Sequence, residues 1–426
     1  MDDWQERDLM NLTSLIKDGS HGSHMDLDVG IPLLSAKDVR DGVLKIPENC
    51  RKISNLDYQA IHRSYEVKKY DILLTIVGSI GRCYLVDGTE PQFSFQRSVA
   101  VIRPEGIDPK YLFHYFRSEK FQNCLKELTN ASAQGGVYLG ALAGCQIKFP
   151  VCFEEQRKIA TILSAIDKAI EQTEAIIAKQ QRIKTGLMQD LLTRGIDEHG
   201  NIRSEATHAF KDSPLGRIPV EWAATPLSSV VDMQVGYAFK SAWFAEEGIS
   251  LLRGENVGYG ELNWSDRRCL PLELAAAYSD YLLATGNIVI GMDRTFTKQG
   301  VKISCLQDED LPCLLVQRVG RFVPKKIPVS YMQVILQSPI YQAELMLHQK
   351  GMDIPHLSKD EILSPLIPMP SNPNELDRIS DQFTRLNSLE SINNNQLSKL
   401  RLQKAALMQD LLTGKVRVTP LLEAGA

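Results

Sequence analysis

The strongest constraint on this chain is a seven-residue identity between two distant segments. Residues 187–193 spell Leu-Met-Gln-Asp-Leu-Leu-Thr, and residues 407–413 repeat the same letters at an offset of 407 − 187 = 220. Self-similarity at a fixed step is the signature of repeated structural units. The identity therefore predicts that the chain is an internal duplication.

Other landmarks keep nearly the same step and the same order. Trp4 matches Trp222, and the dipeptide Gln96-Arg97 is matched with Gln317-Arg318. Further collinear pairs are Gly30 with Gly248, Tyr111 with Tyr331, Ser118 with Ser338, Pro150 with Pro368, and Glu155 with Glu375. The 426 residues are thus expected to be one unit of about 215 residues, written twice and then diverged.

In each unit the predicted secondary structure changes once along the sequence, from short strands with a helical patch to one long helix. Residues 1–150 hold short β-like runs, such as 72–78 and 98–102, followed by a helical patch at 111–128. Residues 155–193 contain no proline and carry apolar residues every three or four positions, which predicts one long amphipathic helix with a copy ending near 411. Because about 39 residues extend ~58 Å, such a helix is expected to pair with its copy.

The expected helix ends carry capping signals. Asn372-Pro373-Asn374-Glu375 is typical of an N-cap, a proline at the first helical position and a capping-box glutamate. Gly195 and Gly414 stand where a left-handed residue would end each helix. Thr173 and Asn393 fall at equivalent seam positions, which indicates either a local weak spot or a polar layer that sets the helix register.

These patterns predict an α+β fold, with two globular α/β domains related by duplication and joined by two long antiparallel helices that form a coiled-coil spacer. The expected boundaries are 1–150 for the first domain, 151–195 for the first helix, 196–218 for a polar linker, 219–370 for the second domain, 371–414 for the second helix and 415–426 for a tail.

Catalytic and metal-binding motifs are missing from the sequence. No GxxxxGK[ST] loop, GxSxG elbow or CxxC pair occurs, and the eight cysteines are scattered. No apolar run approaches the ~20 residues of a membrane span, and no leader is evident, so we expect a cytoplasmic protein. We therefore predict a non-catalytic chain that itself binds no metal and no cofactor, although 52 acidic residues could hide the carboxylates of a nuclease.

Charge argues mildly against a nucleic-acid binder. The net charge is −4 and the pI is near 6.1. Residues 1–150 hold 18 Lys and Arg against 19 Asp and Glu, and residues 195–373 hold 16 against 21. Any binding of DNA phosphates is thus expected to use local basic patches or partner proteins.

The chain resembles, from end to end, the specificity subunit of type I restriction–modification enzymes. The residues that carry the resemblance are Asp18-Gly19-Ser20-His21, 30–39, Asp71–Leu74 with Gly78–Arg82, Phe153–Ile159, 187–193, 210–219 and 414–418. The second unit departs from the pattern, because Asn287 stands where the first has Asp71 and no Gly-Ser-Ile-Gly string follows.

The resemblance implies a DNA reader in which each domain is a target recognition domain that binds half of an asymmetric bipartite site. It implies that the helices set the gap and dock two modification subunits, which bring S-adenosylmethionine, and that restriction subunits add cleavage driven by ATP and Mg²⁺. Candidate DNA contacts in the first unit are His21, Ser23, His24, Lys37, Ser79, Arg82, Gln96 and Arg97, and in the second unit Lys240, Arg253, Asn256, Arg294, Lys298, Gln317 and Arg318. Candidate contacts with the modification subunits are Leu187, Met188, Gln189, Asp190, Leu407, Met408, Gln409 and Asp410.

Two other functional classes stay open from the sequence alone. One is a stand-alone nuclease or modification enzyme with an unrecognised site, and the other is a structural spacer that links two proteins without DNA. The arrangement of two domains on a rigid spacer favours DNA, because successive helical turns repeat every ~34–36 Å.

Overall fold

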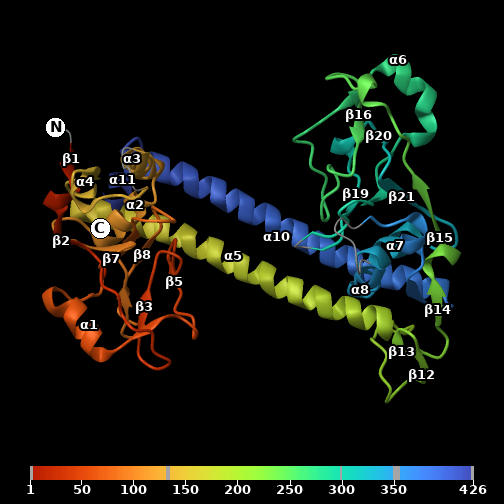
Figure 1. Cartoon of the computed structure of the whole chain (residues 1–426), viewed down its shortest axis with the longest axis horizontal. Coiled ribbons are helices and arrows are strands. Elements are labelled where there is room, and N and C mark those ends of the chain that lie inside the picture. The colour runs from red at the N-terminus through yellow and green to blue at the C-terminus, as the bar shows by residue number, and fades with distance from the viewer. Residues whose placement is uncertain (1–2, 131–134, 298–299, 349–355, 424–426) are drawn as a thin grey trace. The chain divides into compact units, whose positions relative to one another are not determined.

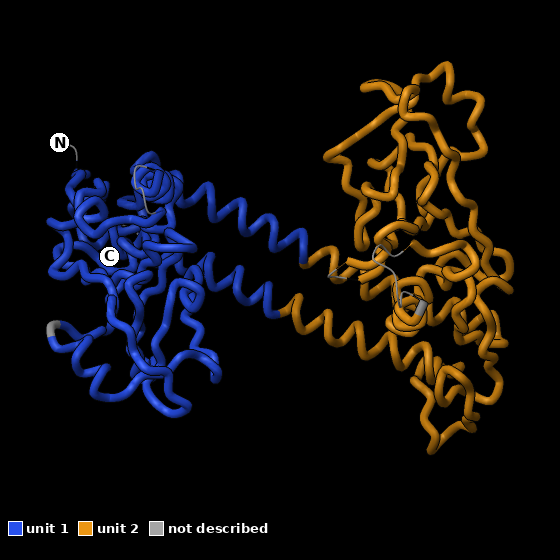
Figure 2. Tube along the Cα trace, viewed as in Figure 1, with its two compact units in different colours: residues 1–175, 394–426 blue, residues 176–393 orange. Residues whose placement is uncertain are grey.

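The computed structural model of the chain describes residues 3–130, 135–297, 300–348 and 356–423. The chain divides into two compact units, residues 1–175 with 394–426 and residues 176–393 (Figure 2). This division cuts each long helix, so each unit holds one globular part and a segment of both helices. Both units mix sheets with helices (Figure 1).

The first unit is built on a four-stranded antiparallel sheet in the order β2-β10-β7-β8. In a second sheet, β3 pairs parallel with β9 and antiparallel with β6, while β1 pairs with β11 and β4 with β5. The strands are β1 Trp4–Asp8, β2 Thr13–Asp18, β3 Ile31–Leu34, β4 Val39–Arg40, β5 Val43–Leu44, β6 Lys52–Ile53, β7 Ile72–Thr75, β8 Cys83–Leu85, β9 Ser94–Phe95, β10 Val99–Pro104 and β11 Gln146–Pro150. The helices that begin in this unit are α1 Asn55–Ile61, α2 Pro109–Phe116, α3 Glu119–Asn130, α4 Leu139–Ala143 and α5 Phe153–Thr193, and α11 Thr419–Glu423 follows α10.

The second unit repeats this topology. Its four-stranded sheet has the order β15-β21-β18-β19, β16 pairs parallel with β20 and antiparallel with β17, and β14 pairs with β22. The strands are β12 Phe210–Ser213, β13 Gly216–Pro219, β14 Ala223–Pro226, β15 Val231–Val235, β16 Ile249–Leu252, β17 Cys269–Leu270, β18 Ile288–Gly291, β19 Ile303–Cys305, β20 Cys313–Leu315, β21 Val319–Pro324 and β22 Leu366–Met369. The helices are α6 Leu272–Ala275, α7 Val329–Leu336, α8 Pro339–His348, α9 Lys359–Leu363 and α10 Pro373–Thr413. The same strand order in both units is what an internal duplication predicts.

The two long helices, α5 and α10, are 41 residues each, as their periodicity and capping signals predict. Gly195 and Gly414 follow their last turns with φ of 71° and 76°, which confirms the left-handed ends. Asn372 caps α10, because its side-chain oxygen accepts the amide of Asn374 at 3.0 Å. The expected capping box is wrong, since the carboxylate of Glu375 turns away to a different set of donors.

Glu375 is 1% exposed and accepts a bidentate pair from Arg203, with one of its two bonds at 3.1 Å. It also accepts the indole N–H of Trp222 at 3.2 Å and the amide of Ile196 at 2.9 Å. A Cβ on Gly195 would overlap this carboxylate and the Trp222 ring, so only glycine fits at that position. The start of α10 is thereby fastened to the segment that follows α5.

The first unit contains the equivalent fastening. Glu155, at the start of α5, is fully buried and accepts both guanidinium bonds of Arg417 at 2.7 Å each. Arg417 lies in the segment after α10, and Trp4 packs against Gly414 there as Trp222 packs against Gly195. In each unit, therefore, the beginning of one long helix is tied to the end of the other.

The ends of the long helices also complete the two cores. Leu411 and Leu412 of α10 belong to the core of the first unit, and Met188, Leu191 and Leu192 of α5 belong to the core of the second. Because burial of apolar side chains is the main driving force of folding, both copies of the repeated heptapeptide perform the same packing task.

Within each unit the two long helices run antiparallel. In the first unit Lys404 bonds Asp167 at 2.6 Å and Arg401 bonds Glu174 at 2.7 Å; in the second, Lys184 bonds Glu390 at 2.7 Å. Of the two polar seam residues, Asn393 donates across the pair to Gln180 at 2.8 Å, which favours a register role. Thr173 instead bonds the carbonyl of Ala169 on its own helix.

Two segments differ from the sequence-based expectation. The helical patch at 111–128 is two helices, α2 and α3, because the turn between them breaks the pattern at Arg117 and Ser118. The polar linker at 196–218 contains the hairpin β12–β13, and it buries Ile196, Arg203 and Ile218 within the second unit. No helix in the part of the chain that the structure describes is long and apolar enough to cross a membrane.

Candidate nucleic-acid interface

The loop after β2 meets the turn after β9 at one end of the first unit. The amide of Ser20 bonds the carbonyl of Phe95 at 2.9 Å, and the amide of Arg97 bonds the carbonyl of Ser20 at 3.0 Å. A Cβ on Gly19 would overlap the Phe95 carbonyl oxygen, so glycine is required for this close approach. Backbone contacts thus fix the loop and the turn against each other.

Four of the eight candidate DNA contacts of this unit, His21, His24, Gln96 and Arg97, line one cavity of about 320 Å³. The other lining residues are Ser20, Gly22, Leu33 and Arg51. Sequence reasoning missed Ser20 and Arg51, although Ser20 adjoins His21. The cavity is walled mainly by hydrogen-bonding side chains, which suits a polar ligand rather than an apolar one.

Part of the cavity wall is held by a hydrogen-bonded chain. Ser20 Oγ lies 2.6 Å from His24 Nε2, and His24 Nδ1 lies 3.0 Å from Asp57 Oδ1. Hydrogen bonds from Ser54 and then His24 lower the pKa of Asp57, so its carboxylate is ionised and accepts a hydrogen bond from the Nδ1–H of His24. In the neutral imidazole, this tautomer leaves His24 Nε2 as the acceptor of a hydrogen bond from the Ser20 hydroxyl.

This order of groups is also that of a serine-hydrolase triad, but here the Ser20 oxygen accepts the amide of Gly22 at 3.1 Å within the loop. Arg51 adds a bond to the carbonyl of His24 at 2.5 Å and an ion pair to Asp26. We therefore assign the Ser20–His24–Asp57 hydrogen bonds a positioning role, in which they make the cavity wall rigid.

Gln96 and Arg97 contrast with this wall. Among the residues that the structure describes, their side chains make no hydrogen bond or ion pair, and Arg97 is exposed. Their backbone is fixed, because Gln96 bonds Leu34 at 2.8 Å and Val99 bonds Gln96 at 3.0 Å. The turn therefore offers two polar side chains, free to bind a ligand, on a fixed backbone.

The remaining candidates of the first unit lie outside the cavity lining. Ser23 is exposed in the loop after β2, and Lys37 is exposed in the turn that Asp38 closes by accepting the Ser35 amide at 2.8 Å. Ser79 and Arg82 belong to the hairpin between β7 and β8, where Thr75 bonds the carbonyl of Ser79 at 2.5 Å. That these four residues contact DNA remains a prediction.

In the second unit, the candidate DNA contacts in the loop after β16 bond to other residues of the same loop. Asn256 is 2% exposed; it accepts the amide of Arg253 at 3.1 Å and donates to Asn263 at 2.9 Å. Arg253 pairs with Glu255 and with Asp266, the latter at 3.0 Å. The placement of Asn256 contradicts a direct base contact in this conformation, because its amide is spent on holding the loop.

Basic side chains gather beside the turn after β20. Arg318 lies 3.4 Å from Asp293 and 2.9 Å from His356, and Arg294 is exposed next in sequence to Asp293. Burial, followed by the neighbouring charge of Arg294, lowers the pKa of Lys302, while Asp293 and Glu255 act in the opposite direction. Sequence reasoning missed Lys302 and His356.

Three candidates of the second unit remain. Lys240 is exposed, with its ammonium 5.4 Å from the centroid of the Trp243 ring. Gln317 is exposed in the turn after β20. Lys298 lies outside the described residues.

The structure corrects the alignment of the two Gln-Arg dipeptides. Val99 bonds back to Gln96, and Val319 bonds back to Val316, so the two turns close between equivalent residues. Arg97 is therefore equivalent to Gln317, and Arg318 is equivalent to Ser98. The identical letters lie one residue out of register, so their match is a coincidence.

The repeated heptapeptides are mostly engaged within the chain. Met188 is 4% exposed in the core of the second unit, and Leu187, Leu407 and Met408 pack against the two cores. Asp190 pairs with Arg194 at 3.6 Å, and Asp410 pairs with Lys415 at 3.2 Å. Gln189 and Gln409 are exposed, and Gln409 and Met408 line a groove of about 770 Å³ with residues of α2 and α3.

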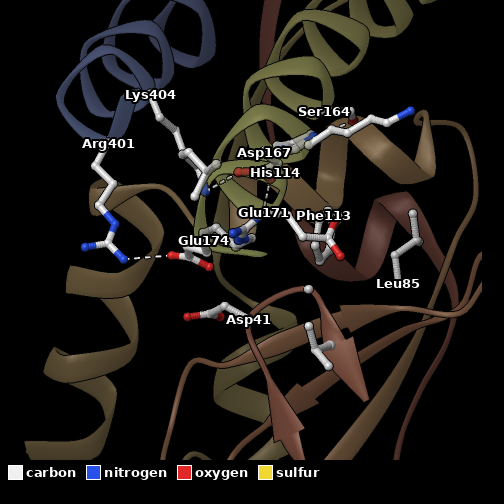
Figure 3. A pocket seen from close by; sticks show the side chains of 15 residues that line it. Asp41, Leu85, Phe113, His114, Ser164, Asp167, Glu171, Glu174, Arg401 and Lys404 are labelled. Carbon is white, nitrogen blue, oxygen red and sulfur yellow. Dashed lines mark hydrogen bonds and ion pairs between the residues drawn. The ribbon is translucent and has the colours of Figure 1, made fainter. Parts of the chain in front are cut away.

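A second cavity, of about 650 Å³, lies where the sheet of the first unit meets both long helices (Figure 3). Asp167 of α5 bonds Arg117 at 2.5 Å and Lys404 of α10 at 2.6 Å. Burial alone would raise the pKa of Asp167, but the two cations outweigh it and the pKa is lowered. This charged joint holds the globular part to both helices.

Comparisons with known proteins agree with this architecture. Residues 1–180 match the family model described as the type I restriction modification DNA specificity domain. The chain is 29% identical over 430 residues to the type I restriction enzyme MjaVIII specificity subunit of Methanocaldococcus jannaschii, covering 99% of this chain and 94% of that protein. The resemblance of the chain to type I restriction–modification specificity subunits is thereby confirmed.

Two further similarities are to proteins of the same kind. The type I restriction enzyme EcoAI specificity subunit of Escherichia coli is 31% identical over 180 residues, which cover 41% of this chain and 30% of that protein. The crystal structure of the type I restriction–modification S subunit from M. genitalium shares the fold, with a TM-score of 0.60 over 96% of both chains at 17% identity. The loops described above therefore lie on a fold that this chain shares with that S subunit.

The structure shows no cluster of three or more His, Cys, Asp or Glu side chains that could hold a metal ion within residues 3–130, 135–297, 300–348 and 356–423.

Proposed function

We propose that this specificity subunit reads an asymmetric bipartite DNA site, with each globular part acting as a target recognition domain for one half. The observation that carries this proposal is the duplication itself. Two units share strand order and backbone frame, yet they present different polar side chains from equivalent loops. Sequence in DNA is read by such side chains at base edges, whereas the backbone frame only positions them.

We also propose that the paired helices form a coiled-coil spacer that sets the gap between the half-sites and docks two modification subunits. Apolar side chains that are about half exposed or more remain on these helices: Ile176, Ile183, Leu389, Ile392 and Leu402. Exposed apolar side chains on a helix pair suit docking of further helices. The modification subunits would bring S-adenosylmethionine, and restriction subunits would bring ATP and Mg²⁺ chemistry, all in the cytoplasm.

The test of this function is reconstitution with the modification subunits and selection from a randomised duplex library. The complex should enrich one split motif and methylate it, while the isolated chain should show no methyltransferase or nuclease turnover. Turnover by the isolated chain would favour a stand-alone enzyme. Assembly without any enriched motif would favour a spacer between proteins.

The spacer role makes a geometric prediction. Inserting seven residues into both helices, at equivalent positions, adds ~10.5 Å of helix and keeps the apolar seam nearly in phase. The complex should then recognise the same two half-sites with a gap wider by about three base pairs, since each pair rises ~3.4 Å. Sequencing of methylated DNA measures the gap, and an unchanged gap would show that the helices do not set it.

A further inference from the structure

The turn between β9 and β10 in the first unit and the turn between β20 and β21 in the second unit close with the same backbone hydrogen bonds. The two turns differ at their third residue, because Arg318 has a φ of 69° and its equivalent, Ser98, has no positive φ. In the first unit Gly19 bonds Val99 at 3.1 Å, and the turn closes from Val99 to Gln96 at 3.0 Å. In the second, Gly236 bonds Val319 at 3.0 Å, and the turn closes from Val319 to Val316 at 3.1 Å.

The second turn residue is also held in the same way. The amide of Arg97 bonds the carbonyl of Ser20 at 3.0 Å, and the amide of Gln317 bonds the carbonyl of Tyr237 at 2.8 Å. Gly19 and Gly236 both lie so close to the turn that a Cβ on either would overlap a backbone carbonyl oxygen. A backbone held by this many bonds places the side chain of its second residue reproducibly.

That second residue is where the two units differ in chemistry. Arg97 and Gln317 are both exposed, and neither side chain has a hydrogen-bond or ion-pair partner among the described residues. Residues that hold the fold pack or pair within the chain, whereas these two are free on rigid turns. Arginine pairs in bidentate fashion with guanine O6 and N7, and glutamine pairs with adenine N6 and N7.

We propose that this turn position determines specificity in both domains, with Arg97 reading a guanine in one half-site and Gln317 reading an adenine in the other. The inference rests on the proposed function, because it assigns residues to DNA readout. In the first unit the rigid Ser20–His24–Asp57 chain supports the wall of the cavity beside Arg97.

The experiment exchanges the two side chains in the full chain, assembled with its modification subunits. Arg97→Gln should change one guanine to adenine in the first half-site, and Gln317→Arg should change one adenine to guanine in the second. Each exchange should leave the other half-site as it was. Discrimination at the affected position should fall by about 5- to 150-fold in Arg97→Ala and Gln317→Ala. Lys126→Ala, which removes an exposed cation of α3 that lies outside the cavity lining and is not a candidate DNA contact, is the control and should leave both half-sites unchanged.

Two outcomes would overturn the inference. Unchanged half-sites in both exchanges would show that the turn does not read bases. If Arg97→Ala instead weakened binding to all DNA sequences equally, and the slope of log binding constant against log salt concentration became shallower by about one, Arg97 would be a phosphate contact. Failure of the proposed function looks different, because the unsubstituted complex would then enrich no split motif at all.

Discussion

Glu375→Gln is expected to lower the free energy of unfolding of the second unit by about 3–5 kcal/mol, the usual cost of removing one partner from a buried ion pair. The carboxylate is 1% exposed and satisfies three groups, the guanidinium of Arg203, the indole of Trp222 and the amide of Ile196. Glutamine has nearly the same shape but no charge, so the buried Arg203 would keep only its partly exposed ion-pair partner, Glu221. Urea denaturation followed by tryptophan fluorescence measures the loss.

The chain offers a control on the same arginine. Glu221 lies 3.3 Å from Arg203, but its side chain is 42% exposed. Exposed ion pairs contribute about 0–1 kcal/mol, so Glu221→Gln should be nearly neutral. If Glu375→Gln lowered the free energy of unfolding as little as Glu221→Gln, the buried Glu375–Arg203 ion pair would not be what fastens the start of α10 to the segment after α5.

The helix ends were predictable from sequence because their signals are local. The glycines after the repeated heptapeptides and the asparagine before Pro373 act within one turn of the residues they cap. The role of Glu375 was not predictable, since its partner Arg203 lies 172 residues earlier in the chain. A glutamate at the third helical position fits a capping box equally well until the tertiary partner is known.

The repeat predicted the fold but misled at single-residue resolution. Gln96-Arg97 and Gln317-Arg318 share letters, yet the hydrogen bonds of the turns pair Arg97 with Gln317. Letters cannot reveal a one-residue shift in a turn, because only the backbone bonds define which positions are equivalent. The sequence predicted part of the cavity lining, since His21, His24, Gln96 and Arg97 come together there. It did not predict Arg51, which lies directly before β6, far from these residues in the sequence.

His114 is expected to make the first unit lose stability as the pH falls below neutrality. The side chain is 1% exposed, its Nε2 lies 3.0 Å from Ser164 Oγ, and its Nδ1 is buried without a hydrogen-bond partner. Burial, which outweighs the attraction of Asp167, lowers the pKa of His114 to about 3. The imidazole therefore stays neutral in the folded unit under conditions where it charges in the unfolded chain.

The sign of the effect follows from proton binding. Between the unfolded pKa of about 6.5 and the folded value, the unfolded state binds one more proton, so stability falls by about 1.4 kcal/mol for each pH unit of acidification. The loss from pH 6.5 to pH 4.5 should be about 2–3 kcal/mol. Asp167 stays ionised throughout this window, because its pKa is lowered and its own contribution is lost only near and below pH 4.

Denaturation of the full chain at several pH values between 4.5 and 6.5 measures this slope. His114→Gln should reduce this slope by about 1.4 kcal/mol per pH unit, the contribution of one proton, because glutamine does not titrate. Ser164→Ala is the matched control: it removes the Nε2 partner at a cost of about 1 kcal/mol at every pH but keeps the titrating ring. Equal slopes in the unsubstituted chain and in His114→Gln would show that the imidazole is charged in the folded unit, and Asp167, 3.9 Å from its Nδ1, would then be its counter-ion.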